Sequence, residues 1–325
     1  MKKNLLVSPS PHIRTDETVE SIMWDVVIAL IPAMLISIYF FRMQAISVLL
    51  VSVISAVVVE VLCQIVMQRE IQIFDGSAVV TGLLFAFVVP PGMSWWVTMI
   101  GSGISILLGK MVFGGLGHNI FNPALVGRAF VTASWPVAIT TFTNLDGTAG
   151  PTVLGIVKNY DLSNGFDVIA GYPFMHELFT SGTIYVDMFI GNIPGSLGET
   201  SVLALLIGGA YLFYKKHITW HIPVSYVGTV FILMLITGND PFLHILSGGL
   251  ILGALFMATD MVTTPYTKVG KFIFGVGAGV LVVLIRLRGG YPEGVCYSIL
   301  IMNGFTPLIN KYTRPRVFGE VKNNG

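Results

Sequence analysis

Charged side chains are scarce in this 325-residue chain, making up 11% of it, against about 25% in a soluble domain. Hydrophobic residues make up 54%, and the mean hydropathy is +0.80. Because so few charges cannot solvate a surface of this size, the composition predicts an integral membrane protein with lipid as a partner. The net charge of +1 provides no field that would attract nucleic acid, and nucleic-acid binding is excluded.

Cysteine is almost absent. Cys63 and Cys296 both lie in apolar runs, and no Cys-x-x-Cys occurs. The four thiolates of an iron–sulfur cluster cannot come from this chain alone, so electron transfer would need another carrier. We predict no metal site and no catalytic side chain. A Gly-x-Gly-x-x-Gly fingerprint after a soluble strand is also missing, so the sequence predicts no dinucleotide site in this chain.

What the chain does have is long apolar runs. A hydrocarbon core of about 30 Å needs roughly 20 helical residues. The runs predict an all-α polytopic protein with ten transmembrane helices, six strong and four shorter, at Ile22–Phe41, Ala45–Met67, Ala78–Pro90, Met93–Phe113, Phe121–Trp135, Thr200–Tyr214, Ile222–Gly238, Phe242–Ala258, Lys271–Leu287 and Pro292–Ile309. They divide into a first membrane half, 22–135, and a second, 200–309.

The basic residues predict the orientation, because cytoplasmic loops are enriched in lysine and arginine. Both the N-terminal segment 1–21 and the tail 310–325 are expected in the cytoplasm. That face would hold thirteen bases: Lys2, Lys3, Arg14, Arg69, Lys110, Lys215, Lys216, Lys268, Lys271, Lys311, Arg314, Arg316 and Lys322. The other face would hold four, which are Arg42, Lys158, Arg286 and Arg288, and Arg128 lies within a span.

Residues 136–199 form the one long connection, which this topology places outside the cell. Loops of this length are usually functional or disordered. Aromatic and aliphatic residues recur through the segment, which favours an ordered loop packed against the membrane face.

Each half contains a glycine-rich break next to a short polar motif. The first is Gly114–Pro123, and the second runs from Ser247-Gly248-Gly249 to Thr259–Pro265. Matching breaks predict an inverted-repeat-like pair of halves with discontinuous helices and a site at their interface.

Several polar residues in or near these motifs are candidates for cofactor binding. Asn119 and Asn122 belong to the first motif. Asn122 before Pro123 is also a typical helix start. Arg128 is costly inside a span and needs a partner, so a cofactor site and a structural ion pair both remain open. Asp260 could bind a cation or a polar ring edge, or could simply cap a turn.

Two further acids lie in or near spans. Asp25 is near a helix end, where it could be solvated. Glu60 lies well inside the second run and is a candidate for an ion or proton path.

The stretch Gly-Gly-Leu-Gly-His-Asn-Ile-Phe-Asn-Pro-Ala-Leu-Val-Gly-Arg at 114–128 resembles the signature of the D subunit of the Rnf ion-translocating electron transport complex. A relative of that protein is the B subunit of the Na⁺-translocating NADH:quinone reductase. The resemblance continues through Leu246-Ser-Gly-Gly, Ala258-Thr-Asp and Gly289-Gly-Tyr-Pro-Glu-Gly-Val to the tail from Tyr312, and so covers nearly the whole chain.

The resemblance implies FMN bound covalently, as a phosphoester on a threonine of the extracytoplasmic loop. Aligned on Asp146, that residue is Thr152, with Thr148 in reserve; the chain departs from the family pattern at Ala149, Pro151 and Val153. A non-covalent riboflavin is also implied. So are other membrane and peripheral subunits, among them a second subunit with covalent FMN, in a bacterial or archaeal cell membrane.

Two functions are compatible with the sequence. The first is a membrane electron-transfer subunit carrying covalent FMN, in a ferredoxin:NAD⁺ oxidoreductase-type complex that couples electron flow to Na⁺ or H⁺ translocation. The second is a secondary permease for a small polar solute, because transporters use paired helix breaks and the family's fold resembles that of urea transporters.

Overall fold

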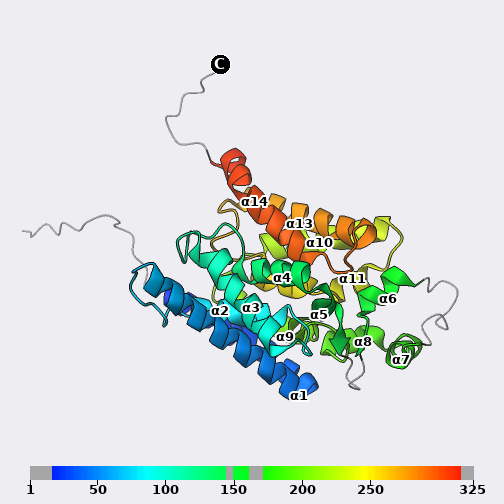
Figure 1. Cartoon of the computed structure of the whole chain (residues 1–325). Helices are drawn as coiled ribbons and strands as arrows, with labels where there is room; N and C mark the ends of the chain where they lie inside the picture. The colour runs from blue at the N-terminus through cyan, green and yellow to red at the C-terminus, as the bar shows by residue number, and fades with distance from the viewer. Residues whose placement is uncertain (1–16, 144–148, 161–170, 316–325) are drawn as a thin grey trace, which may run out of the picture.

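The computed structural model describes residues 17–143, 149–160 and 171–315. Their regular structure is helical apart from one two-residue antiparallel pair, β1 (Phe142–Thr143) with β2 (Ala149–Gly150). Figure 1 shows the helices gathered in one bundle, with α1 along one edge and α10, α13 and α14 along the other.

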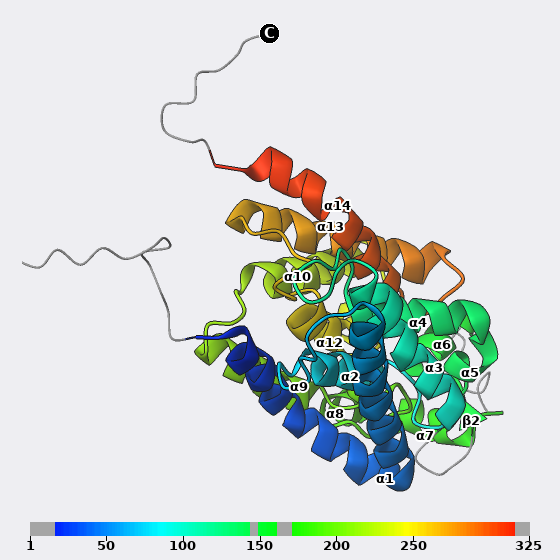
Figure 2. The same ribbon diagram turned by 60° about the vertical axis from the view of Figure 1, so that its left-hand side comes forward.

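Helix α1 (Val19–Val66) is two antiparallel arms joined at Arg42, whose backbone is non-helical (φ 50°, ψ −124°). The Trp24 indole nitrogen near the start of the first arm donates to the carbonyl of Phe74, beyond the end of the second (3.2 Å). One straight helix of 48 residues would be about 70 Å long and would place these groups far apart. Figure 2 shows the two arms meeting at an acute angle. They match the first two predicted runs.

The rest of the first half consists of short helices. These are α2 (Ser77–Phe87), α3 (Trp95–Ile106), the π-helix η1 (Leu107–Met111) that continues α3, and α4 (Pro123–Ser134). Helix α4 starts as predicted: the Asn122 side chain accepts from the backbone N–H groups of Ala124 (3.1 Å) and Leu125 (3.4 Å), and Pro123 takes the first helical position.

The second half combines short helices with two long ones, α13 and α14. It contains α9 (Val202–Tyr214), α10 (His221–Ile236), α11 (Pro241–Leu246), α12 (Leu250–Leu252), the π-helix η5 (Gly253–Met257), α13 (Lys268–Arg288) and α14 (Val295–Thr313). The predicted run Phe242–Ala258 is therefore three helical pieces, broken at Ser247–Gly249.

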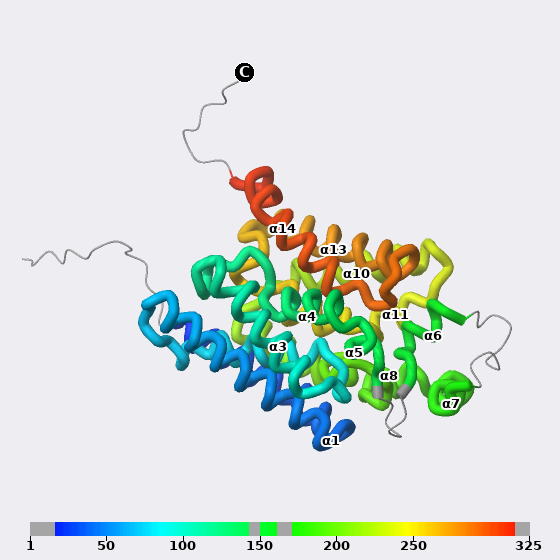
Figure 3. The backbone as a smooth tube through the Cα atoms, in the orientation of Figure 1, coloured from blue at the N-terminus to red at the C-terminus, as the bar shows by residue number. Residues whose placement is uncertain are grey.

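The long connection folds into α5 (Pro136–Thr140), the β1–β2 pair, α6 (Val153–Asn159), α7 (Pro173–Thr180), α8 (Ile184–Ile190) and the 3₁₀ turn η4 (Leu197–Glu199). Its apolar side chains form a cluster of their own that includes Ile156, Met175 and Met188 and reaches Leu243 of α11. Figure 3 shows α6–α8 at one end of the bundle, away from the start of α1 and the end of α14. We call these the loop end and the termini end.

Lipid-facing surface is visible along α1. Leu50, Ile54, Val58 and Leu62, which recur every fourth residue on one face, are between 50% and 59% exposed. By length and composition, α1 and α13 are the two described helices able to cross a membrane. Apolar faces this exposed, together with the composition, identify a helical membrane protein.

Close packing of helices depends on small residues, as at Gly208 in α9. A Cβ placed there would lie 2.0 Å from the carbonyl oxygen of Ala29 in α1. At Gly228 in α10, a Cβ would meet nothing within 4 Å.

We expect Gly208→Ala to lower the thermal stability of the detergent-solubilised protein by about 1–3 kcal/mol, because the backbones must separate. Gly228→Ala is the matched control and should be neutral or slightly stabilising, since alanine favours helix. Equal melting temperatures for the two variants would contradict this packing.

Candidate functional site

A cavity at the loop end brings Thr152 and Arg128 together. It has about 880 Å³ of empty space, part of it open to solvent. Thr152 is the N-cap residue of α6, is 7% exposed, and accepts a hydrogen bond from the Gly155 backbone N–H (3.2 Å). Tyr291 and Tyr297 form an aromatic wall, with ring centroids 5.5 Å apart and planes inclined by 27°.

Arg128 has two acidic partners from different parts of the chain. Its guanidinium donates to the carboxylate of Glu293, and its Nη1 lies 3.7 Å from Oε1 of Glu199. All three residues are at least 91% buried. Arg128 is therefore a buried ion pair, and both Arg128 and Glu293 also line the cavity.

Arg286 of α13 fixes the other side of this charge cluster. Its guanidinium donates to the backbone carbonyls of Glu293 (2.9 Å), Ser247 (3.2 Å) and His244. It therefore ties α13 to the break between α11 and α12.

The glycines at that break leave room for charged side chains. Gly248 and Gly249 have φ of +67° and +65°, which favours glycine. A Cβ on Gly248 would lie 2.9 Å from Nη2 of Arg286, and one on Gly249 would lie 2.9 Å from Oε1 of Glu199.

Two contacts fasten elements of the long connection to the bundle. The Lys158 amine at the end of α6 donates to the carbonyls of Gly289 (2.5 Å) and Tyr291 (3.0 Å), and partial burial lowers its pKa. The Tyr185 hydroxyl of α8 donates to the Asp240 carboxylate, which raises the tyrosine pKa to about 12.

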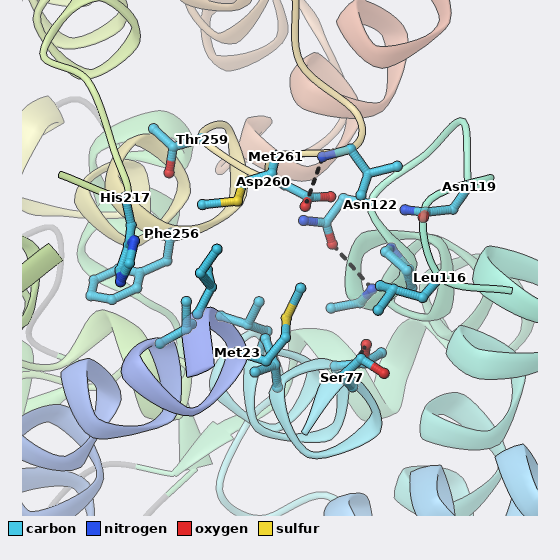
Figure 4. A pocket seen from close by; sticks show the side chains of 18 of the residues that line it. Met23, Ser77, Leu116, Asn119, Asn122, His217, Phe256, Thr259, Asp260 and Met261 are labelled. Atoms are coloured by element: carbon cyan, nitrogen blue, oxygen red, sulfur yellow. Dashed lines mark hydrogen bonds between the residues drawn. The ribbon is translucent and has the colours of Figure 1, made fainter. Parts of the chain in front are cut away.

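A second cavity lies at the termini end and gathers the other predicted residues. Asn119, Asn122 and Asp260 line it, together with apolar side chains such as Met23 and Phe256. Figure 4 shows both asparagines on one side, Thr259, Asp260 and Met261 on another, and Met23 and Ser77 opposite them. Both π-helices contribute, η1 through Lys110 and η5 through Phe256.

Polar atoms of this second cavity are only partly used within the protein. Asn119 donates to the carbonyl of Phe121 (3.3 Å), but its Oδ1 has no hydrogen-bond partner among the described residues, although the residue is 5% exposed. Asp260 accepts from the Val262 N–H (3.4 Å) and the Thr263 hydroxyl (3.1 Å). The Asn122 amide donates to the carbonyl of Met257 (3.3 Å), which joins the two motifs.

Lys110 borders the same cavity and pairs with Glu60. Its Nζ lies 2.5 Å from Oε1 of Glu60 and 2.5 Å from the Ser77 hydroxyl. Lys110 is 2% exposed and Glu60 3%. The sequence marked Glu60 as a candidate for an ion or proton path, but it did not identify Lys110 as its partner.

Asp25 is not a solvated acid at a helix end, as the sequence allowed. Its carboxylate accepts from the Tyr211 hydroxyl (2.6 Å), contacts Nε2 of His217 (2.8 Å) and lies 3.5 Å from the Lys215 amine. This cluster links α1 to the connection between α9 and α10.

The structure thus divides the predicted site residues into two groups at opposite ends of the bundle. Thr152 and Arg128 line one cavity, whereas Asn119, Asn122 and Asp260 line the other. The reserve residue Thr148 lies outside the described residues. Sequence reasoning missed Glu199 and Glu293 as partners of Arg128. It also counted Lys110 and Arg286 as loop charges, although both are buried. Lys110 pairs with Glu60, and Arg286 donates to three backbone carbonyls.

The fold and these cavities define a class: a helical membrane protein with buried charge clusters beside a cavity at each end. Comparison with known proteins gives the family. The model of the NQR2, RnfD, RnfE family matches residues 6–319. The chain belongs to this family, which confirms the resemblance seen in the motifs.

Three relatives show how close the similarity is. The D subunit of the proton-translocating ferredoxin:NAD(+) oxidoreductase complex of Clostridium ljungdahlii is 48% identical, with 98% of each chain covered. The D subunit of the Na(+)-translocating complex of Acetobacterium woodii is 43% identical, covering 98% of this chain and 96% of the relative. The D subunit of the ion-translocating oxidoreductase complex of Halorhodospira halophila is 32% identical, covering 96% and 95%.

Removing Arg128 should be strongly destabilising, because Glu199 and Glu293 would remain buried without their shared cation. We expect Arg128→Met to lower the free energy of unfolding by about 3–5 kcal/mol. Arg288→Met, an exposed arginine on the same helix as Arg286, is the control and should change it by less than about 0.5 kcal/mol. Thermal unfolding in detergent measures both, and similar losses would argue against the buried cluster.

Proposed function

We propose that this chain is a membrane electron-transfer subunit that carries FMN covalently on Thr152. It works in a ferredoxin:NAD⁺ oxidoreductase-type complex that couples electron flow to translocation of Na⁺ or H⁺. The observation that carries the proposal is the position of Thr152, which lines a cavity with aromatic walls and a buried arginine. The relatives' names favour this function over a permease.

The residues of the loop-end cavity fit FMN. A hydroxyl is available for a phosphoester, and Tyr291, Tyr297, Ile139 and Phe142 offer apolar and aromatic surface to a flavin ring. Bound there, the flavin would accept and pass on electrons, which the side chains of this protein do not do. Arg128 would supply a positive charge beside it, and Lys158 would hold α6, and so Thr152, against the bundle.

The termini-end cavity fits a second, non-covalent flavin such as riboflavin. Riboflavin lacks the phosphate and is uncharged, and its ring edge carries hydrogen-bond donors and acceptors. The free Oδ1 of Asn119, the Asn122 amide and the Asp260 carboxylate supply complementary groups, and Met23 and Phe256 supply apolar walls.

We also propose the ten-span topology with both termini in the cytoplasm and residues 136–199 outside the cell. Each of the ten apolar runs contains helix, and α1 supplies the first two as a hairpin. Without Lys110 and Arg286, twelve bases remain on the cytoplasmic face and three on the other, so the asymmetry persists.

The halves have a common design that supports an inverted repeat. Lys110 at the end of α3–η1 reaches the hydroxyl of Ser77, which begins α2; Arg286 near the end of α13 reaches the backbone carbonyl of Ser247, which ends α11 at the break before α12. The two cations lie at opposite ends of the bundle. The remaining membrane and peripheral subunits, including a second one with covalent FMN, would bind the apolar faces and the ends that the bundle leaves exposed.

Covalent FMN predicts a fluorescent band on a denaturing gel viewed under ultraviolet light. For protein from its native host, we expect Thr152→Ala to abolish the band, because the phosphoester would lose the side-chain oxygen that forms it. Thr148→Ala should leave it unchanged. Absence of a band in the wild-type protein would refute the covalent cofactor, whereas loss only in Thr148→Ala would reassign the site.

A non-covalent flavin in the termini-end cavity predicts a second, separable cofactor. Denaturation of the purified protein should release one flavin without phosphate, while the covalent band stays on the chain. Asn119→Leu should reduce the released flavin and spare the covalent one. Asn192→Leu, at a residue just after α8 that donates to the Asp187 carboxylate, is the control; equal release from both variants would place the second flavin elsewhere.

A further inference from the structure

A third cavity, also at the loop end, is lined by basic and neutral side chains. It has about 490 Å³ of empty space, part of it open to solvent. Lys158 of α6, His244 of α11 and Arg286 of α13 contribute the polar part of its lining together with Asn239. None of its described lining residues is acidic. The cavity is therefore a place of positive charge beside the one that Thr152 lines.

Arg286 is buried here without a carboxylate of its own. It is 3% exposed, and its three hydrogen bonds go to backbone carbonyls, which carry no net charge. Glu199 and Glu293, whose charges also act on it, are both paired with Arg128. A buried cation without an anion is costly inside a membrane protein, so the space beside Arg286 is suited to an anion.

Lys158 brings a second positive charge to the same cavity from the long connection. Its amine donates to the backbone carbonyls of Gly289 and Tyr291. These carbonyls satisfy the N–H groups but leave the charge in place. Neither Lys158 nor Arg286 forms an ion pair among the described residues. Two cations, one from the connection and one from the bundle, thus line one cavity without a counterion from the described part of the chain.

His244 is an independent indication of a ligand. It is 5% exposed, and its Nδ1 has no hydrogen-bond partner among the described residues. Its backbone carbonyl accepts from the Arg286 guanidinium, which keeps the two residues together. Buried polar atoms nearly always have partners, so an unpartnered imidazole on a cavity wall indicates a ligand that forms hydrogen bonds. Water would satisfy the imidazole but would leave the charges of Arg286 and Lys158 uncompensated.

Apolar surface beside the cavity indicates one source for such an anion. Leu287, which lines the cavity, is exposed. Ile236 at the end of α10 and Phe242 in the first turn of α11 are exposed as well, and they flank the lining residue Asn239 in the sequence. Exposed apolar side chains on a membrane helix contact acyl chains. A lipid would therefore meet cations at its headgroup and apolar side chains along its tails.

We propose that this cavity binds a phosphate group, held by Arg286, Lys158 and His244. The guanidinium fork has further N–H donors that match phosphate oxygens, the imidazole N–H donates another bond, and the lysine adds charge. The phosphate is either the headgroup of a phospholipid at the loop end or a free ion, since the recognition chemistry is the same. The inference goes beyond the proposed function and requires neither flavin.

A bound phosphate would also strengthen the attachment of α6. Lys158 lines the phosphate cavity, whereas Thr152 on the same helix lines the other cavity, and Pro292 lines both. An anion between Lys158 and Arg286 would join this helix to α13 by charge, in addition to the carbonyl contacts.

The test uses the full-length chain in a neutral detergent. Thermal unfolding is followed while dihexanoylphosphatidylglycerol, inorganic phosphate or sodium chloride is added at matched ionic strength. A ligand that binds only the folded protein raises the melting temperature in a saturable way. We expect saturation with the phospholipid, with inorganic phosphate or with both, and none with sodium chloride. Saturation with the phospholipid alone identifies a lipid headgroup, whereas saturation with inorganic phosphate identifies a site open to the free ion.

Substitutions at His244 test the assignment of the site. His244→Leu removes the imidazole and keeps the backbone carbonyl that holds Arg286, so we expect the apparent Kd to rise about ten-fold or more, because a hydrogen bond to a charged group is lost. His244→Gln supplies a side-chain N–H donor again and should recover most of the affinity. Arg288→Gln changes an exposed base of the same helix that does not line the cavity, and it should bind like the wild type.

Val157→Phe provides a second route if His244→Leu fails to fold. It keeps all three polar groups but fills the cavity from α6, and it should weaken binding as well. Absence of a saturable rise in the wild type with either phosphate compound would overturn the inference. So would wild-type affinity in both His244→Leu and Val157→Phe, or a loss in Arg288→Gln as large as theirs, which would indicate general surface electrostatics.

Discussion

The cost of burying charge determines how this bundle is built. In a membrane protein an unpaired ion inside the helices is expensive, so each buried cation must find an anion or a set of carbonyls. Arg128 is shared by Glu199 and Glu293, Arg286 is held by three carbonyls, and Lys110 is held by Glu60 and Ser77. These contacts join segments far apart in the sequence, and Arg128 and Glu293 are separated by 165 residues. The charge clusters therefore fix which helices meet.

Helix breaks are the structural means by which these charges are accommodated. A continuous helix uses all its carbonyls internally and presents Cβ atoms all round. At Ser247–Gly249 the chain instead frees a carbonyl for Arg286 and omits the side chains that would collide with Arg286 and Glu199. The π-helix η1 itself contains Lys110, and π-helical turns are frequent at functional sites. Each cavity thus borders a place where regular helix gives way to pairing of charge.

The sequence predicts the local structure well, because apolar runs and caps act over short distances. Each of the ten runs contains helix, and Asn122–Pro123 begins α4 as expected. The pairing of charges across the bundle, by contrast, does not follow from the local sequence. Glu199 and Glu293 look like ordinary polar residues in loops, and Lys110 and Arg286 look like terminal charges of spans, since nothing local records their burial. Arg128 was the one residue whose sequence position indicated a buried ion pair, because an arginine inside a span requires a partner. The sequence did not identify the two glutamates that provide it.

The difference between the two halves is more informative than their similarity. Both bring a buried cation against a serine, Lys110 onto the Ser77 hydroxyl and Arg286 onto the Ser247 backbone carbonyl, but the cations differ. Arg286 belongs to the loop end, where a covalently tethered cofactor would need a rigid frame, and its three carbonyl contacts provide one. Lys110 belongs to the termini end, where its partner Glu60 has one oxygen without a hydrogen-bond partner among the described residues. The two ends of the bundle therefore hold their buried cations in different ways, one by neutral backbone carbonyls and the other by a carboxylate and a hydroxyl.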